Sequence, residues 1–91
     1  MDKFEKFKAG AKEAWSTFQP FESMTGTAAP HLVRFAKITA GQNVLDVGSG
    51  TGVVALTASR TGATVTGSDL SPQLVEHARR NAELAGLEIP F

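Results

Sequence analysis

The stretch VLDVGSGTGVV, from Val44 to Val54, decides how this chain folds. An apolar run there ends in a single acid, Asp46, and three glycines follow at alternate positions. NVLDV (43–47) is short, apolar and bounded by turn residues, which predicts a strand buried on both faces, as in a parallel sheet. VVALTASRTG (53–62) predicts a short helix that Gly62 ends.

The same pattern is repeated once downstream. ATVTGSD (63–69) predicts a second strand, and SPQLVEHARRNAELAG (71–86) predicts a helix with an N-cap serine, a proline in its first turn and a glycine after its end. LEIPF (87–91) could open a third strand. A strand, glycine loop, helix, strand and helix make a βαβα unit with a right-handed crossover. We therefore predict an α/β fold with a Rossmann-like partial parallel sheet of two to three strands.

Two helices are predicted to precede this unit. The first runs from Asp2 to about Phe18, and its aromatic stripe is expected to pack on the core. Asp2 is its predicted N-cap, with Glu5 at the reciprocal position. The second is capped by Thr27 and runs to about Ile38, with four residues facing inward: Leu32, Val33, Phe35 and Ala36. The predicted division is thus a helical segment over 1–40 and the first half of a ligand-binding domain over 41–91.

Composition narrows the class of protein. A chain of 91 residues makes at most one small domain, and its nine acids balance nine bases, which argues against electrostatic capture of nucleic acid. The chain has no cysteine, which excludes thiol nucleophiles, disulfides and cysteine-ligated metals, and no metal site is predicted. It has no membrane-spanning apolar run, and its charged N-terminus is unlike a secretory signal. A cytoplasmic protein is the expectation.

The glycine loop is the predicted binding site, because ligands of βα units sit at the carboxyl ends of the strands. Asp69, at the end of the second strand, could accept hydrogen bonds from both hydroxyls of a ribose. A dinucleotide fingerprint in the frame of Gly50 is met only with Ala55 as its third small residue, and Asp46 would repel a pyrophosphate. An acid there suits a ligand with a positive group. The alternatives are that Asp46 only orders the loop and that Asp69 is an ordinary loop acid before Ser71.

VLDVGSGTG resembles motif I of the class I S-adenosylmethionine-dependent methyltransferases, D/E-x-G-x-G-x-G. VTGSDLSPQLVEHARRNA is similar to the segment that follows that motif, and FQPFESMTGTAAPHLVRFA is similar to the region before it. The resemblance implies that the glycine loop contacts the methionine portion of the cofactor through its backbone. It also implies that Asp46 holds the ammonium, that Asp69 binds the ribose and that Leu70 packs against adenine. The implied cofactor-binding residues are Asp46, Gly48, Ser49, Gly50, Thr51, Gly52, Asp69 and Leu70.

The resemblance implies a transferase whose parent moves a methyl group to a small molecule or another, unidentified acceptor. No catalytic residue can be assigned, and His31 is interpreted as a surface residue. In the family, the groups that address adenine and the acceptor follow the third and fourth strands, beyond Phe91. We therefore expect a fragment of a domain, inactive by itself, that binds the cofactor weakly and self-associates into an oligomer. The alternatives are a nucleoside- or dinucleotide-binding module without catalysis and a self-associating scaffold.

Overall fold

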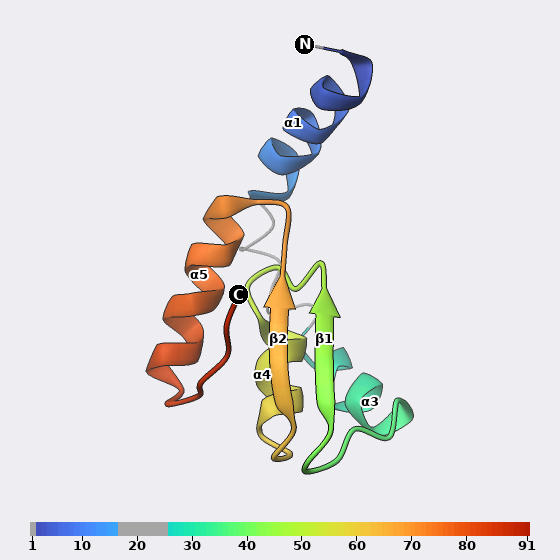
Figure 1. Ribbon diagram of the computed structural model, residues 1–91, viewed down its shortest axis with the longest axis vertical. Coiled ribbons are helices and arrows are strands. Elements are labelled where there is room, and N and C mark those ends of the chain that lie inside the picture. The colour runs from blue at the N-terminus through green and yellow to red at the C-terminus, as the bar shows by residue number, and fades with distance from the viewer. Residues whose placement is uncertain (1, 17–25) are drawn as a thin grey trace.

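The computed structural model describes residues 2–16 and 26–91 (Figure 1). The chain orders its elements as α1 (Lys3–Ser16), α3 (Ala28–Phe35), β1 (Asn43–Val47), α4 (Val53–Ser59), β2 (Thr64–Ser68) and α5 (Pro72–Leu84). Strands β1 and β2 are parallel, and α4 connects them. The α/β prediction is therefore confirmed, and both strands point their carboxyl ends to the same edge (Figure 1).

The two strands pair in register from Asn43 with Thr64 to Val47 with Ser68. The far edge of β2 receives the C-terminal segment, since the Gly67 N–H donates a 2.8 Å hydrogen bond to the Pro90 carbonyl. That segment runs beside β2 on the side away from β1 (Figure 1). It is not a regular strand, but it occupies the place where the sequence predicted that a third strand could open.

The described elements cover one face of the sheet only. Helix α4 lies behind the strands in Figure 1 and contacts both of them, and α3 packs against α4. Val65 is buried beneath them, whereas Leu45 and Val47 are 64% and 76% exposed on the opposite face. The prediction that NVLDV is buried on both faces is thus wrong for this chain. The reason is that the described helices nearest the sheet pack on the same side of it.

The core lies between α3, α4, β2, α5 and the C-terminal segment. Alanines at the helix contacts let these backbones approach closely, and larger side chains fill the space beside the sheet. Its buried members are Val33, Ala55, Leu56, Ala58, Ala63, Val65, Ala82 and Ile89.

The ends of α5 follow the sequence signals. Ser71 Oγ accepts a hydrogen bond from the Leu74 N–H at 3.3 Å, and Pro72 occupies the first helical position. At the other end, Gly86 has a φ of 70°, while the Leu87 N–H reaches back to the Ala82 carbonyl. This is a Schellman ending, in which a left-handed residue closes the helix. Both predicted caps are confirmed.

Helix α3, which precedes β1, differs from its predicted form more than α5 does. Helix α3 ends at Phe35 rather than near Ile38, and Thr27 stands at its N-cap without a side-chain hydrogen bond. Val33 is buried as predicted, but Leu32 and Phe35 are 50% and 87% exposed, and Ala36 is also exposed. A helix of eight residues presents one narrow face to α4, so only part of the predicted set reaches the core.

Helix α1 begins as predicted, with Asp2 Oδ1 accepting a 2.7 Å hydrogen bond from the Glu5 N–H. It contacts α5 and projects away from the sheet (Figure 1). Phe4 and Phe7 are 67% and 72% exposed, so the prediction that this part of the stripe packs on the core is wrong. The predicted end near Phe18 lies outside the described residues. No helix in the described ranges has the length and apolar character needed to cross a bilayer.

Candidate functional site

The glycine loop leaves β1 and is fastened to the end of β2. The backbone N–H groups of Gly48 and Ser49 both donate to the Ser68 carbonyl oxygen, each at 2.8 Å. Ser49 Oγ donates to the same oxygen at 3.2 Å. Three donors on one carbonyl hold the first half of the loop at the carboxyl edge of the sheet, where ligands of parallel sheets bind.

The alternate glycines all have a positive φ. Gly48, Gly50 and Gly52 have φ values of 74°, 58° and 92°, in the left-handed region that residues with a Cβ avoid. A Cβ at Gly48 or Gly50 would meet no atom within 4 Å, whereas one at Gly52 would lie 2.9 Å from Leu56 Cδ1. The loop therefore presents two bare stretches of main chain that a ligand can approach, while its last glycine packs against α4.

Asp69 lies where the second strand has ended and joins the loop to α5. Its Oδ2 accepts a hydrogen bond from the Gly50 N–H at 2.9 Å, and its Oδ1 accepts one from the Ser71 N–H at 2.9 Å. An ionised carboxylate has about four acceptor positions, so each oxygen keeps capacity for a further donor such as a hydroxyl. Its neighbour Leu70 is 52% exposed. The ribose role of Asp69 and the adenine role of Leu70 stay predictions.

Asp46 lies on the helix-covered face of the sheet, opposite Gly67 in the strand register. Among the described residues, its buried Oδ2 has no hydrogen-bond partner. Burial raises the pKa of the Asp46 carboxyl, the backbone N–H of Ala55 acts in the opposite direction, and the Asp69 carboxylate adds to the rise. A positive group placed between these carboxylates would offset both the burial and the repulsion.

The structure places the eight residues that the sequence predicted for the site at one edge of the sheet: Asp46 in β1, Gly48 to Gly52 in the loop after it, and Asp69 and Leu70 directly after β2. It places His31 elsewhere, exposed on α3 with its Nδ1 3.1 Å from Arg34 Nη2. No cluster of three or more side chains suited to metal binding occurs within residues 2–16 and 26–91.

Sequence reasoning missed Asn81. Its Nδ2 donates a 2.9 Å hydrogen bond to the Thr51 carbonyl of the glycine loop, across 30 residues of sequence. One signal was available: Asn81 is a polar residue at the border of an otherwise apolar helical stripe that includes Ala78 and Ala82. A polar side chain in such a place needs a partner in the interior.

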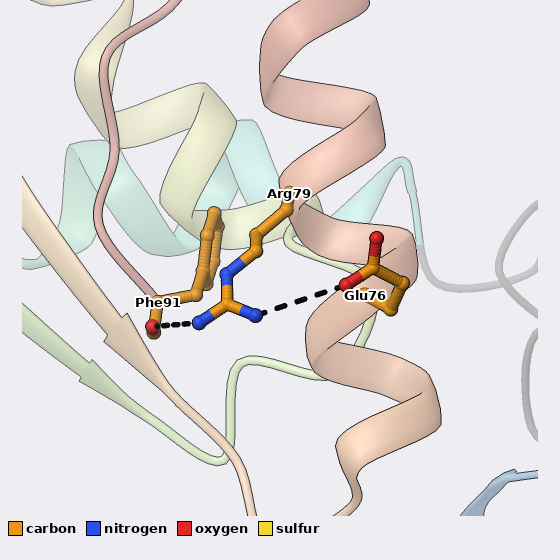
Figure 2. A network of polar contacts seen from close by, with 3 residues as sticks. All are labelled: Glu76, Arg79 and Phe91. Atoms are coloured by element: carbon orange, nitrogen blue, oxygen red, sulfur yellow. Dashed lines mark hydrogen bonds and ion pairs between the residues drawn. The ribbon is translucent and has the colours of Figure 1, made fainter.

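Sequence reasoning also missed the packing of the C-terminal residue Phe91 beside the glycine loop. The ring of Phe91 lies against Gly67, where a Cβ would collide with it, and a Cβ on Gly52 would lie 3.3 Å from Phe91 Cζ. Figure 2 shows Arg79 of α5 between Phe91 and Glu76: its Nη2 donates to the Phe91 carbonyl at 3.0 Å, and its Nη1 lies 3.7 Å from Glu76 Oε2. The C-terminal segment is thus attached both to β2 and to α5.

Comparison with known proteins matches this chain to methyltransferases. A family model described as a methyltransferase domain matches residues 44–91. The ubiquinone biosynthesis O-methyltransferase of Actinobacillus pleuropneumoniae serotype 5b is 36% identical over 91 residues, covering all of this chain and 39% of that protein. The demethylmenaquinone methyltransferase of Tropheryma whipplei is 52% identical over 46 residues, covering 50% of this chain and 19% of that protein.

Solved structures agree with these relatives. An RNA methyltransferase from Salinibacter ruber, solved with S-adenosylhomocysteine, superposes with a TM-score of 0.68 and 32% identity, over 71% of this chain and 44% of that chain. This chain covers less than half the length of each of these three proteins.

Proposed function

Since this chain belongs to the methyltransferase domain family, among the class I S-adenosylmethionine-dependent enzymes, we propose that its glycine loop and its two strand-end carboxylates bind that cofactor. One observation carries the proposal: Asp46 Oδ2 is buried and unpartnered among the described residues, with a second carboxylate near enough to raise its pKa. This arrangement destabilises an empty site and favours a ligand with a positive group.

Each of these residues is assigned to a different part of the cofactor. Gly48 and Gly50 present bare main chain to the methionine portion, and Asp46 receives its ammonium. Asp69 accepts hydrogen bonds from the ribose hydroxyls with the capacity that Gly50 and Ser71 leave unused. Leu70, half-exposed beside Asp69, covers one side of the adenine.

S-adenosylmethionine supplies an electrophilic methyl group on a sulfonium. The residues of this chain would hold the cofactor in place for transfer of that group, which is a proximity effect rather than acid–base chemistry. Because the chain spans 39% of its relative named for ubiquinone biosynthesis, methyl transfer is proposed for the full-length protein and not for these residues alone.

We propose a small-molecule acceptor of the quinone-precursor class. The support is that two relatives, at 36% and 52% identity, are named for ubiquinone biosynthesis and for demethylmenaquinone. Nucleic acid is the less favoured acceptor, although one structural neighbour is an RNA methyltransferase, because the chain's formal net charge is zero. Methyl transfer from labelled cofactor to a hydroxylated quinone precursor, with RNA as the competing substrate, distinguishes the two.

The cofactor assignment is tested by titration calorimetry of the complete gene product with S-adenosylhomocysteine and, separately, with NAD. We expect the first to bind and the second not to bind. Asp69→Asn should weaken S-adenosylhomocysteine binding roughly tenfold to a hundredfold, because hydrogen bonds to a charged acceptor contribute about 1.5–3 kcal/mol.

Asp2→Asn is the matched control, since asparagine also caps helices and Asp2 lies on α1, away from the site. Tighter binding of NAD than of S-adenosylhomocysteine would favour a dinucleotide-binding module. Binding of neither ligand would favour a scaffold.

A further inference from the structure

We propose that Asn81 of α5 is a positioning residue for the glycine loop: its side-chain amide holds the Thr51 carbonyl and so sets the main chain that meets the cofactor. The inference rests on the proposed function, because it concerns the same loop. It adds a residue that lies on another element and has no predicted contact with the ligand.

The geometry shows a peptide unit held at both ends. Asn81 Nδ2 donates to the Thr51 carbonyl oxygen at 2.9 Å, and the N–H of the same peptide, on Gly52, donates to the Ser49 carbonyl at 2.9 Å. The carbonyl and N–H of a trans peptide point in opposite directions, so these two bonds fix the peptide plane. Rotation of this peptide would break both bonds at once. Thr51 is only 5% exposed, so water cannot readily replace the amide donor.

The loop needs such an anchor because of its composition. Gly50 and Gly52 flank Thr51, with φ values of 58° and 92°, and glycine populates many other conformations at little energetic cost. A loop of this kind without a fixed point loses more conformational entropy when it binds a ligand. Anchoring the Thr51–Gly52 peptide before binding reduces that cost, and affinity rises accordingly.

The chemistry requires a donor at position 81. The Thr51 carbonyl oxygen can only accept, and asparagine offers an N–H on a short, half-buried side chain. Aspartate has almost the same shape but presents an acceptor to an acceptor. Asn81→Asp therefore removes the bond while changing little of the packing volume.

The experiment titrates S-adenosylhomocysteine into the complete gene product by calorimetry, for the wild type, Asn81→Asp and Asn43→Asp. Asn43 is the matched control, because it is exposed at the opposite end of β1 and its substitution makes the same change of charge. We expect Asn81→Asp to bind about threefold to tenfold more weakly, the range that one net hydrogen bond supplies. Asn43→Asp should stay within twofold of the wild type.

A purely structural role gives a different result. In that case Asn81→Asp would lower the melting temperature of the cofactor-free protein, yet its folded fraction would bind S-adenosylhomocysteine as the wild type does, and the proposal would be overturned. Absence of binding by the wild type itself would overturn the proposed function, and this inference with it.

A measurement on the wild type alone covers the case in which Asn81→Asp does not fold. By NMR, the side-chain amide protons of Asn81 should exchange with solvent more slowly than those of Asn43 in the cofactor-free protein. Equal exchange rates for the two asparagines would show that the bond to Thr51 is not maintained in solution, and would overturn the proposal.

Discussion

At the scale of single residues, the environment of the Asp46 carboxylate in the candidate site is electrostatically unfavourable. Asp46 is half-buried on the covered face of the sheet, its Oδ2 has no partner among the described residues, and Asp69 is close enough to raise its pKa. A fold selected for stability alone would avoid this arrangement, because buried acceptors without partners are costly. Its retention is understandable if a cationic ligand completes it.

The substitution Asp46→Asn tests this electrostatic cost through the pH dependence of folding stability. Since the folded-state pKa of Asp46 lies above its ordinary value of 3.8, the folded protein favours the protonated carboxyl. The stability that this group contributes is present below pH 3.8 and is lost as the pH rises through the folded-state pKa. Without cofactor, Asp46→Asn should therefore melt at a higher temperature than the wild type at pH 7, and the difference should disappear below pH 3.8.

Melting curves of both proteins across pH, with and without S-adenosylhomocysteine, check this expectation. The variant should also gain less stability from the ligand than the wild type gains. A variant that is less stable than the wild type at pH 7 without ligand would contradict the account of Asp46.

Gly52→Ala addresses the packed end of the loop. The new Cβ would lie 2.9 Å from Leu56 Cδ1, in a residue held at a φ of 92°. Strain of this kind costs about 1–3 kcal/mol of unfolding free energy. Chemical denaturation measures the loss, and Gly10→Ala on α1, where a Cβ would meet nothing within 4 Å, is the control. Equal stability of the two variants would mean that the loop relaxes without cost.

At the scale of elements, the helix ends show how local chemistry sets boundaries. Helices α3 and α5 both finish in a Schellman ending, with Ile38 and Leu87 donating back to Val33 and Ala82. In α5 the left-handed position is Gly86, whereas α3 places Lys37 there, at a φ of 57°. Because lysine has a Cβ, α3 ends at a higher conformational cost than α5 does.

Lys37→Gly should therefore stabilise the protein, by about 0.5–1 kcal/mol after the entropy that glycine adds to the unfolded chain. Gly86→Lys is the reciprocal change and should destabilise it. Thermal denaturation of the two variants under one buffer condition gives both values. Loss of stability in Lys37→Gly would show that the lysine side chain makes a contribution larger than its strain.

At the scale of the whole molecule, residues 2–16 and 26–91 cover one face of the sheet and leave the other face open. The open face carries Leu45 and Val47, and a shallow hollow there is lined by Asn43, Val44, Leu45, Thr64 and Thr66. Apolar side chains beside a strand edge that no described residue pairs with favour association between chains.

We expect the 91-residue chain to self-associate through this face. Leu45→Thr combined with Val47→Thr keeps strand propensity and removes the apolar surface, so light scattering should show a smaller particle at the same concentration. Phe4→Gln combined with Phe7→Gln is the control for association through α1. A monomeric wild type, or a change only in the α1 variant, would contradict this role of the open face.

The sequence by itself determined the local features. The alternation of an apolar run, a glycine loop and a capped helix specified β1, α4, β2 and α5, because their strand and helix signals act over a few residues. The positions of the glycine loop and of its two acids were predictable for the same reason, since a βα unit brings strand ends to one edge.

Only the tertiary structure decided which faces were buried and which residues supported the loop. Phe4, Phe35 and Leu45 look like core residues in sequence, yet they are exposed because no described element covers them. The bond from Asn81 to Thr51 spans 30 positions, and the packing of Phe91 against Gly67 spans 24. Such contacts depend on how α5 and the C-terminal segment return to the sheet. The reason is physical: burial and long-range hydrogen bonds belong to pairs of elements, and a periodic pattern describes only one element at a time.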